Sequence, residues 1–145
     1  MPRYTRDTER FLAYGRVILG EAEYDYIPCA YCGAPATDRE HVFPQSAAFA
    51  STGDAFTMPT RRIIVPACRE CNVLAGRKVF DGIEAKREYI RSQLRRRYRK
   101  YLDMPHWTEE ELVTLSTQLA SYVRRSLRMK AILQRRVRWT GKSFV

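Results

Sequence analysis

The chain has 145 residues, 45% of them hydrophobic, so it can form one compact domain and is too short for two ordinary ones. It carries 26 Lys and Arg against 16 Asp and Glu, a formal net charge of +10. This balance favours a polyanionic partner, nucleic acid first, and the excess of arginine over lysine suits bidentate phosphate contacts. Because the N-terminus lacks an apolar signal region and no apolar run approaches the ~18 residues of a membrane span, we expect a cytoplasmic protein.

The chain divides into three parts within a single domain, residues 1–145. In the first part, residues 1–28, apolar residues recur at three- and four-residue spacing between positions 5 and 20 and predict an N-terminal amphipathic helix. Residues 29–80 contain all the cysteines and form the predicted core. Residues 81–145 have a different, strongly basic composition and form the predicted helical extension.

The four cysteines lie in two C-x-x-C pairs, Cys29 with Cys32 and Cys68 with Cys71. In a reducing compartment such pairs bind metal more often than they form disulfides, and four thiolates bind zinc tetrahedrally. The alternative is four free cysteines that fill a hydrophobic core. Two such pairs are improbable by chance among only four cysteines, so the spacing predicts a structural zinc site.

The pattern around the cysteine pairs predicts an α+β fold. Side chains from Thr37 to Phe43 would alternate in a first strand, and the β-branched stretch Arg62 to Val65 predicts a second. Between them, residues 45–60 are small and polar and predict a loop. A helix is expected from Arg69 to about Phe80. The order is cysteine pair, strand, loop, strand, cysteine pair, helix.

Two long helices are expected after residue 80. Asp81 and Glu84 resemble a capping box at the start of the first helix, which Met104 and Pro105 would end. A second capping box, Thr108 with Glu111, would begin the next helix, which continues to about Val137. The apolar stripe of the first helix contains Ile83, Ile90, Leu94, Tyr98 and Tyr101.

Fifteen Lys and Arg residues lie between Lys86 and Arg138, along these predicted helices. Basic residues in this arrangement contact phosphates without reading sequence, with an affinity that falls steeply with salt. A charged run is usually a solvated face, and that interpretation holds for any single arginine. The densest cluster predicts DNA contacts at Arg95, Arg96, Arg97, Arg99 and Lys100.

Only two histidines are present, and they differ in context. His106 lies at a helix boundary, where packing or capping is expected. His41 follows Glu40 in the first predicted strand and could face Asn72 after the last cysteine. A neutral imidazole can take a proton from water, and carboxylate and amide oxygens can hold Mg²⁺. The alternative is a surface ion pair between Glu40 and His41, and strand alternation requires a bulge or a strand end there if both act at one site.

The motifs C-A-Y-C, E-H-V-F-P and V-P-A-C-R-E-C-N, from Cys29 to about Lys78, resemble the HNH (ββα-metal) endonucleases, particularly those of phages and mobile elements with a four-cysteine zinc site. The resemblance implies a treble-clef-like ββα core in a phage-encoded or bacterial protein. It implies that His41 is the general base, and that Glu40 and Asn72 bind a catalytic Mg²⁺ or Mn²⁺ separate from the zinc. It also implies nicking or double-strand cleavage of DNA that leaves 5′-phosphates.

One position departs from the family. The middle asparagine of the HNH motif stands shortly before the third cysteine, where this chain has Arg62 and Ile63. Our leading expectation is a metal-dependent DNA endonuclease. The departure favours a rival, a non-catalytic zinc-finger module that binds DNA or RNA. A third interpretation is an interaction protein whose arginine helices bind acidic protein surfaces.

Overall fold

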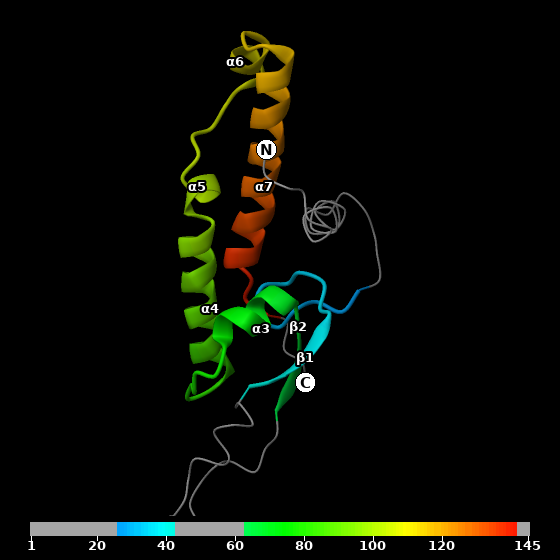
Figure 1. Cartoon of the computed structure of the whole chain (residues 1–145), viewed down its shortest axis with the longest axis vertical. Helices are drawn as coiled ribbons and strands as arrows, with labels where there is room; N and C mark the ends of the chain where they lie inside the picture. Colours follow the sequence, from blue (N-terminus) through cyan, green and yellow to red (C-terminus); the bar gives the residue numbers. More distant parts are fainter. Residues whose placement is uncertain (1–25, 43–62, 142–145) are drawn as a thin grey trace, which may run out of the picture.

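The computed structural model describes residues 26–42 and 63–141. In this part of the chain a two-stranded sheet and a short helix sit beside one end of a long helical arm (Figure 1). The predicted α+β class is confirmed by this mixture of one small sheet and five helices among the described residues. The predicted N-terminal helix (residues 5–20) and the predicted loop (residues 45–60) lie outside the described residues.

The sheet consists of β1 (Asp38–His41) and β2 (Ile64–Ala67), which pair in antiparallel register with Glu40 opposite Val65. The first strand lies within the predicted stretch Thr37 to Phe43 but is shorter, since Thr37 and Val42 are outside it and Phe43 lies outside the described residues. The second was predicted from Arg62, which lies outside the described residues, to Val65, but it extends to Ala67 because Pro66 and Ala67 pair with Arg39 and Asp38. Its side chains alternate between faces, with Val65 buried and Ile64 exposed. A run of β-branched residues marks a tendency to extend, but the burial of alternate side chains fixes which residues pair.

The helix α3 (Arg69–Ala75) follows β2 at once. It begins at Cys68, which is the N-cap, and ends at Gly76, whose φ of 55° lies in the left-handed region that glycine adopts most easily. The predicted end near Phe80 was therefore wrong. This short helix packs on β1 of the sheet.

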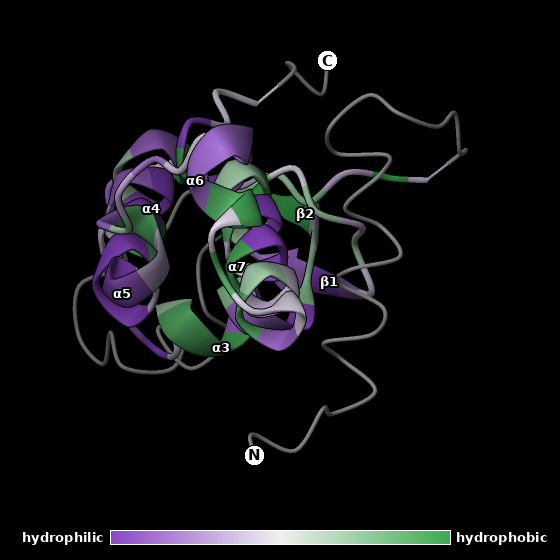
Figure 2. Ribbon diagram, turned by 90° about the horizontal axis from the view of Figure 1, so that it is seen from above, coloured by the Kyte–Doolittle hydropathy of each residue, from purple (hydrophilic) through white to green (hydrophobic). Residues whose placement is uncertain are grey.

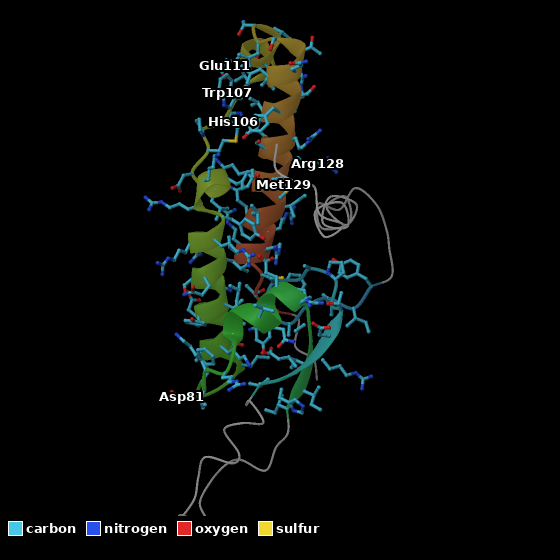
Figure 3. All side chains as sticks on the ribbon, in the orientation of Figure 1. Asp81, His106, Trp107, Glu111, Arg128 and Met129 are labelled. Carbon is cyan, nitrogen blue, oxygen red and sulfur yellow. The ribbon has the colours of Figure 1, made fainter. Side chains whose placement is uncertain are left out.

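The arm contains α4 (Ile83–Arg97), α5 (Arg99–Leu102), α6 (Glu109–Val113) and α7 (Thr117–Val137). Figure 1 shows α4 and α5 running along one side and α7 returning along the other, with α6 at the far end. In Figure 3, Asp81 marks the end of the arm where α4 begins, and Glu111 marks the opposite end. None of the described helices is long and apolar enough to cross a membrane.

Two uninterrupted helices were predicted for the arm, and the helix caps show where the observed helices begin instead. The box at Thr108 and Glu111 forms as predicted, with each side chain accepting the other residue's backbone N–H. The box predicted at Asp81 and Glu84 was wrong, because Gly82 occupies the N-cap of α4 without a side-chain cap. Ser116 caps α7 through the Leu119 N–H, so the second predicted helix divides into α6 and α7.

One continuous core joins the sheet, α3 and the arm. Buried side chains from α4 and α7, including Ile90, Leu94 and Val137, pack with the cysteines, Val42 and Val65. Figure 2 shows largely hydrophilic ribbons for α4 and α5, so the apolar contacts of the arm lie along a narrow inner stripe. The arm therefore packs onto the cysteine-rich unit through a few buried positions.

Candidate metal centre and hydrolytic site

The four cysteines converge in one buried cluster. Their sulfur atoms all lie within 4.8 Å of one another, and Cys32 Sγ is 3.7 Å from Cys68 Sγ. All four thiols are free of disulfides. Four sulfurs placed tetrahedrally at about 2.3 Å from a zinc ion are about 3.8 Å apart. The cluster thus has the spacing of a tetrahedral metal site, and the prediction that these residues could hold a metal ion is confirmed.

The first cysteine pair lies on a tight turn. The Gly33 N–H donates to the Cys29 carbonyl at 2.9 Å, and the Cys29 N–H donates to the Ala34 carbonyl at 2.6 Å. Gly33 has a φ of 73°, and a Cβ built on it would lie 2.5 Å from the ring of Trp139. The absence of a side chain here permits both the turn and the close packing of the segment after α7.

The second pair lies at the start of α3. Cys68 Sγ, at the N-cap, accepts the Cys71 N–H at 3.5 Å, just as Cys29 Sγ accepts the Tyr31 N–H at 3.4 Å. Each pair thus fixes one sulfur by a backbone N–H before any metal binds. Three residues of helix bring Cys68 and Cys71 to the same face, opposite the first pair.

Arg136 reaches the thiol cluster from α7 and is only 2% exposed. Its Nε and Nη2 each lie 3.4 Å from Cys32 Sγ, and Nη2 lies 3.9 Å from Cys68 Sγ and 2.9 Å from Glu70 Oε2. Burial opposes ionisation of the Cys32 thiol, but hydrogen bonds from the other thiols and the charge of Arg136 hold its pKa well below its usual value. The guanidinium therefore favours the thiolate form that a metal ion requires.

Glu70 links this cluster to the arm. Its Oε1 accepts the Tyr98 hydroxyl at 2.5 Å and lies 3.3 Å from Arg97 Nη1, while its other oxygen binds Arg136. Burial and the hydrogen bond to Glu70 raise the pKa of Tyr98 to about 12. One carboxylate of α3 thus joins the end of α4 to the end of α7.

Glu40 lies on the buried face of β1 and is paired with Lys86 of α4. Lys86 Nζ is 2.7 Å from Glu40 Oε1 and 3.1 Å from the carbonyl oxygens of His41 and Val42. Both side chains are buried, with 1% of Lys86 and 7% of Glu40 exposed. The three acceptors match the three protons of the ammonium. Lys86 therefore neutralises Glu40 and attaches α4 to the edge of the sheet.

His41 and Asn72 lie on neighbouring elements. His41 is the last residue of β1, and Asn72 follows Cys71 in α3, which packs on β1. Both are half-buried. The β1–β2 register is regular through His41, so the described strands contain no bulge at this step and alternation directs Glu40 and His41 to opposite faces. Among the described residues, the strand end at His41 is the feature that can turn the imidazole toward the face of Glu40.

A catalytic divalent ion has fewer ligands available here than the thiol site offers. Within residues 26–42 and 63–141, the four cysteines are the group of three or more His, Cys, Asp or Glu side chains that can converge on an ion. Glu40 can offer only Oε2, which is buried and without a hydrogen-bond partner among the described residues. Oxygen ligands are the type that Mg²⁺ prefers, but a hydrated ion keeps several waters and Glu40 is only 6% exposed, so Glu40 and Asn72 stay predicted ligands.

Comparisons with protein-family models, with curated proteins and with solved structures give no match. The resemblance to HNH endonucleases therefore stays a prediction drawn from the motifs. The function is inferred below from the thiol cluster, the residues around His41 and the basic arm.

The predicted DNA-binding residues are all exposed, at the end of α4 and on α5, but they differ in their partners. Arg97 contacts Glu70, and Arg99 Nε lies 3.1 Å from Asp103 Oδ2. Arg95, Arg96 and Lys100 make no ion pair with a described residue. The sequence cluster therefore contains both compensated and uncompensated charges.

Three buried basic residues, Lys86, Arg87 and Arg136, were missed from the sequence. Lys86 and Arg136 were counted with the solvated charges, yet both are buried against acidic partners. A signal was present: Lys86 stands three residues after Ile83 and four before Ile90, on the apolar stripe itself. A charged residue on a buried stripe indicates a buried partner, because an uncompensated charge is too costly there.

Proposed function

We propose that this chain is a metal-dependent DNA endonuclease built on a zinc-bound, treble-clef-like ββα unit with a basic helical arm. The observation that carries the proposal is the order β1, β2, α3 closed by four converging thiols. In that unit His41 ends β1 and Asn72 lies in the helix that packs on it. Zinc, held by the four cysteines, serves as a structural ion that fixes these elements.

In the proposed reaction His41 takes a proton from a water molecule, whose oxygen then forms a bond to phosphorus. The bond from phosphorus to the 3′-oxygen breaks, and that oxygen takes a proton from solvent, leaving a 5′-phosphate. Glu40 Oε2 and the Asn72 amide oxygen would hold Mg²⁺ or Mn²⁺, which when bound supplies positive charge at the scissile phosphate. The basic arm binds the DNA without reading its sequence.

A second candidate is a zinc-finger module that binds nucleic acid without cleaving it. The observation that favours it is the buried pair of Glu40 with Lys86, because an ammonium 2.7 Å from Oε1 opposes a divalent cation at the same carboxylate. The two candidates share the zinc site and the arm. They differ in whether His41 acts on water.

The deciding experiment is cleavage of supercoiled plasmid by zinc-loaded protein with Mg²⁺, with Mn²⁺ and with neither. We expect nicking that requires the divalent ion and that falls about 10²- to 10⁴-fold in His41→Ala, the usual contribution of a general base. His106→Ala is the matched control, since it removes the other histidine, which is exposed on the arm. Plasmid binding without cleavage under both ions would favour the second candidate, and equal loss in both variants would remove His41 from the mechanism.

A further inference from the structure

A cavity of about 530 Å³ lies where α4 and α5 meet the end of α7. Two of its residues, Leu102 and Val137, are apolar. Sites for small organic ligands are lined mainly by hydrophobic and aromatic side chains, whereas four of the eight residues that line this cavity are arginines. The polar residues that line it, here named the arginine groove, are Arg95, Arg96, Arg99, Asp103, Gln134 and Arg138.

The groove has a surplus of positive charge. Four arginines face one acidic residue, Asp103, which pairs with Arg99. Arg95, Arg96 and Arg138 are exposed and form no ion pair with any described residue. Three uncompensated guanidiniums in one concavity repel one another and concentrate a positive field. Such a site is complementary to closely spaced anions rather than to a single carboxylate.

The arginines of the groove come from three elements. Arg95 lies in the last turn of α4 and Arg99 begins α5, so together they form one wall. Arg138 approaches from the opposite wall, at the C-cap of α7. Guanidinium groups bind phosphate oxygens in bidentate fashion, so two walls of arginine can hold a backbone between them.

We propose that the arginine groove binds the phosphate backbone of duplex DNA. The choice of DNA rests on the proposed function, while the groove itself rests on its charges. The groove is not the same set of residues as the basic cluster predicted from the sequence. It includes Arg138, 39 positions after Arg99, and it leaves out Arg97 and Lys100. Arg97 is instead engaged with Glu70.

The contact between Arg136 and the thiol cluster positions one wall of this groove. Arg136 points inward to the thiols and Glu70, whereas the neighbouring Val137 and Arg138 line the groove. Because these residues are consecutive on the last turn of α7, fixing Arg136 also fixes the orientation of Arg138. The metal site thus supports DNA binding without touching DNA.

The test compares two double variants that remove the same charge. Arg95→Gln with Arg138→Gln takes one arginine from each wall, and Arg69→Gln with Arg77→Gln takes two exposed arginines that lie outside both the groove and the arm. Fluorescence anisotropy measures the affinity of zinc-loaded protein for a duplex of about 25 base pairs at salt concentrations from about 50 to 200 mM, a range in which phosphate contacts make affinity strongly dependent on salt. Mg²⁺ and Mn²⁺ are omitted so that no cleavage occurs.

The slope of log K against log salt is negative, and we expect the groove variant to reduce its magnitude by about 2, because each phosphate contact contributes about 1 to that magnitude. Binding at about 0.1 M salt should weaken about 100-fold. The control variant should retain the wild-type slope. Inorganic phosphate at constant ionic strength should fail to displace the duplex. Circular dichroism melting verifies that both variants are folded.

Equal losses in the two double variants, or no duplex binding by the unaltered chain, would overturn the proposal. Displacement by inorganic phosphate would assign the groove to a free anion and likewise overturn it. The plasmid experiment reports on hydrolysis separately. Groove-dependent binding without cleavage would leave this proposal standing and refute the nuclease, whereas cleavage with no difference between the variants would do the reverse.

Discussion

Two basic residues of the arm, Lys86 and Arg136, hold the cysteine-rich unit in different ways. Lys86 of α4 binds Glu40 and two backbone carbonyls of β1 and the residue after it. Arg136 of α7 divides its guanidinium between Glu70 and two cysteine sulfurs. Both side chains are almost fully buried. The acceptors of Lys86 are all oxygens, whereas those of Arg136 include two sulfurs of the cysteine cluster that can hold a metal ion.

This difference separates a contact that includes metal ligands from one that does not. The acceptors of Lys86 are three oxygens and none of them is a thiol, so a bound metal affects this contact only through the folding of β1. Thiolate acceptors are strengthened by deprotonation, and metal binding deprotonates them. The Arg136 contact should therefore respond to zinc, and the Lys86 contact should respond mainly to loss of its carboxylate.

The largest expected effect is that of removing the metal. Chelation of zinc, or Cys71→Ser, should unfold residues 26–42 and 63–75, because structural zinc sites of this type contribute about 10–16 kcal/mol of apparent binding free energy that is coupled to folding. Hydrogen exchange should show loss of protection at the Val42 amide, which donates to the Ile63 carbonyl. Restoring zinc to the chelated protein should restore protection. Unchanged exchange after chelation would show that four buried thiols suffice as core residues.

Lys86→Met should follow in magnitude. Breaking a buried ion pair from one side costs about 3–5 kcal/mol, because Glu40 would stay buried without its partner. Urea unfolding of zinc-loaded protein measures the loss. The matched control Lys100→Met removes an exposed lysine and should change the free energy of unfolding by less than about 0.5 kcal/mol.

The double variant Lys86→Met with Glu40→Leu sharpens this prediction. It removes both charges and should recover much of the stability lost in the single variant, because a buried pair is often replaceable by apolar residues. If Lys86→Met alone costs less than about 1 kcal/mol, Glu40 has another source of compensation, and its availability to a divalent ion has to be judged again.

The features that could be predicted from the sequence are those that depend on residues close together in the chain. The C-x-x-C spacing predicted the thiol cluster, alternation predicted β1, and the Thr108 box predicted the start of α6. The breaks at Tyr98 and before Ser116 were missed, since no proline or glycine marks either of them. An apolar stripe can continue across such a break because packing requires only the spacing of side chains.

The partners of the site residues could not be predicted in this way. Glu40 meets a lysine 46 positions later, and Cys32 meets an arginine 104 positions later. Such pairs depend on how the arm folds back onto the sheet, and the sequence around each residue does not encode that contact. The same limit applies to the arginine groove, because Arg138 becomes a neighbour of Arg95 only through the return of α7.

The smallest expected effect in free energy is that of Arg136→Met, and it distinguishes the two contacts most directly. We expect a loss of about 1–3 kcal/mol, because Glu70 retains Tyr98 and is one-fifth exposed. Loss of a partner that orients a metal ligand also lowers metal affinity about 10- to 100-fold. Apparent affinity alone is ambiguous, however, since folding and metal binding are linked and Lys86→Met should lower it as well.

Substitution of Co²⁺ for zinc resolves that ambiguity. The thiolate-to-cobalt charge-transfer band depends on the electron density at sulfur, which two N–H donors to Cys32 Sγ reduce. The band should shift in Arg136→Met and stay at the wild-type position in Lys86→Met and in Arg135→Met, which removes the exposed neighbouring arginine. A shift in all three variants would mean that the band reports only loosened packing. No shift in Arg136→Met would mean that the guanidinium does not act on the thiolates, and neither Lys86 nor Arg136 would then be coupled to the metal through direct contact with its ligands.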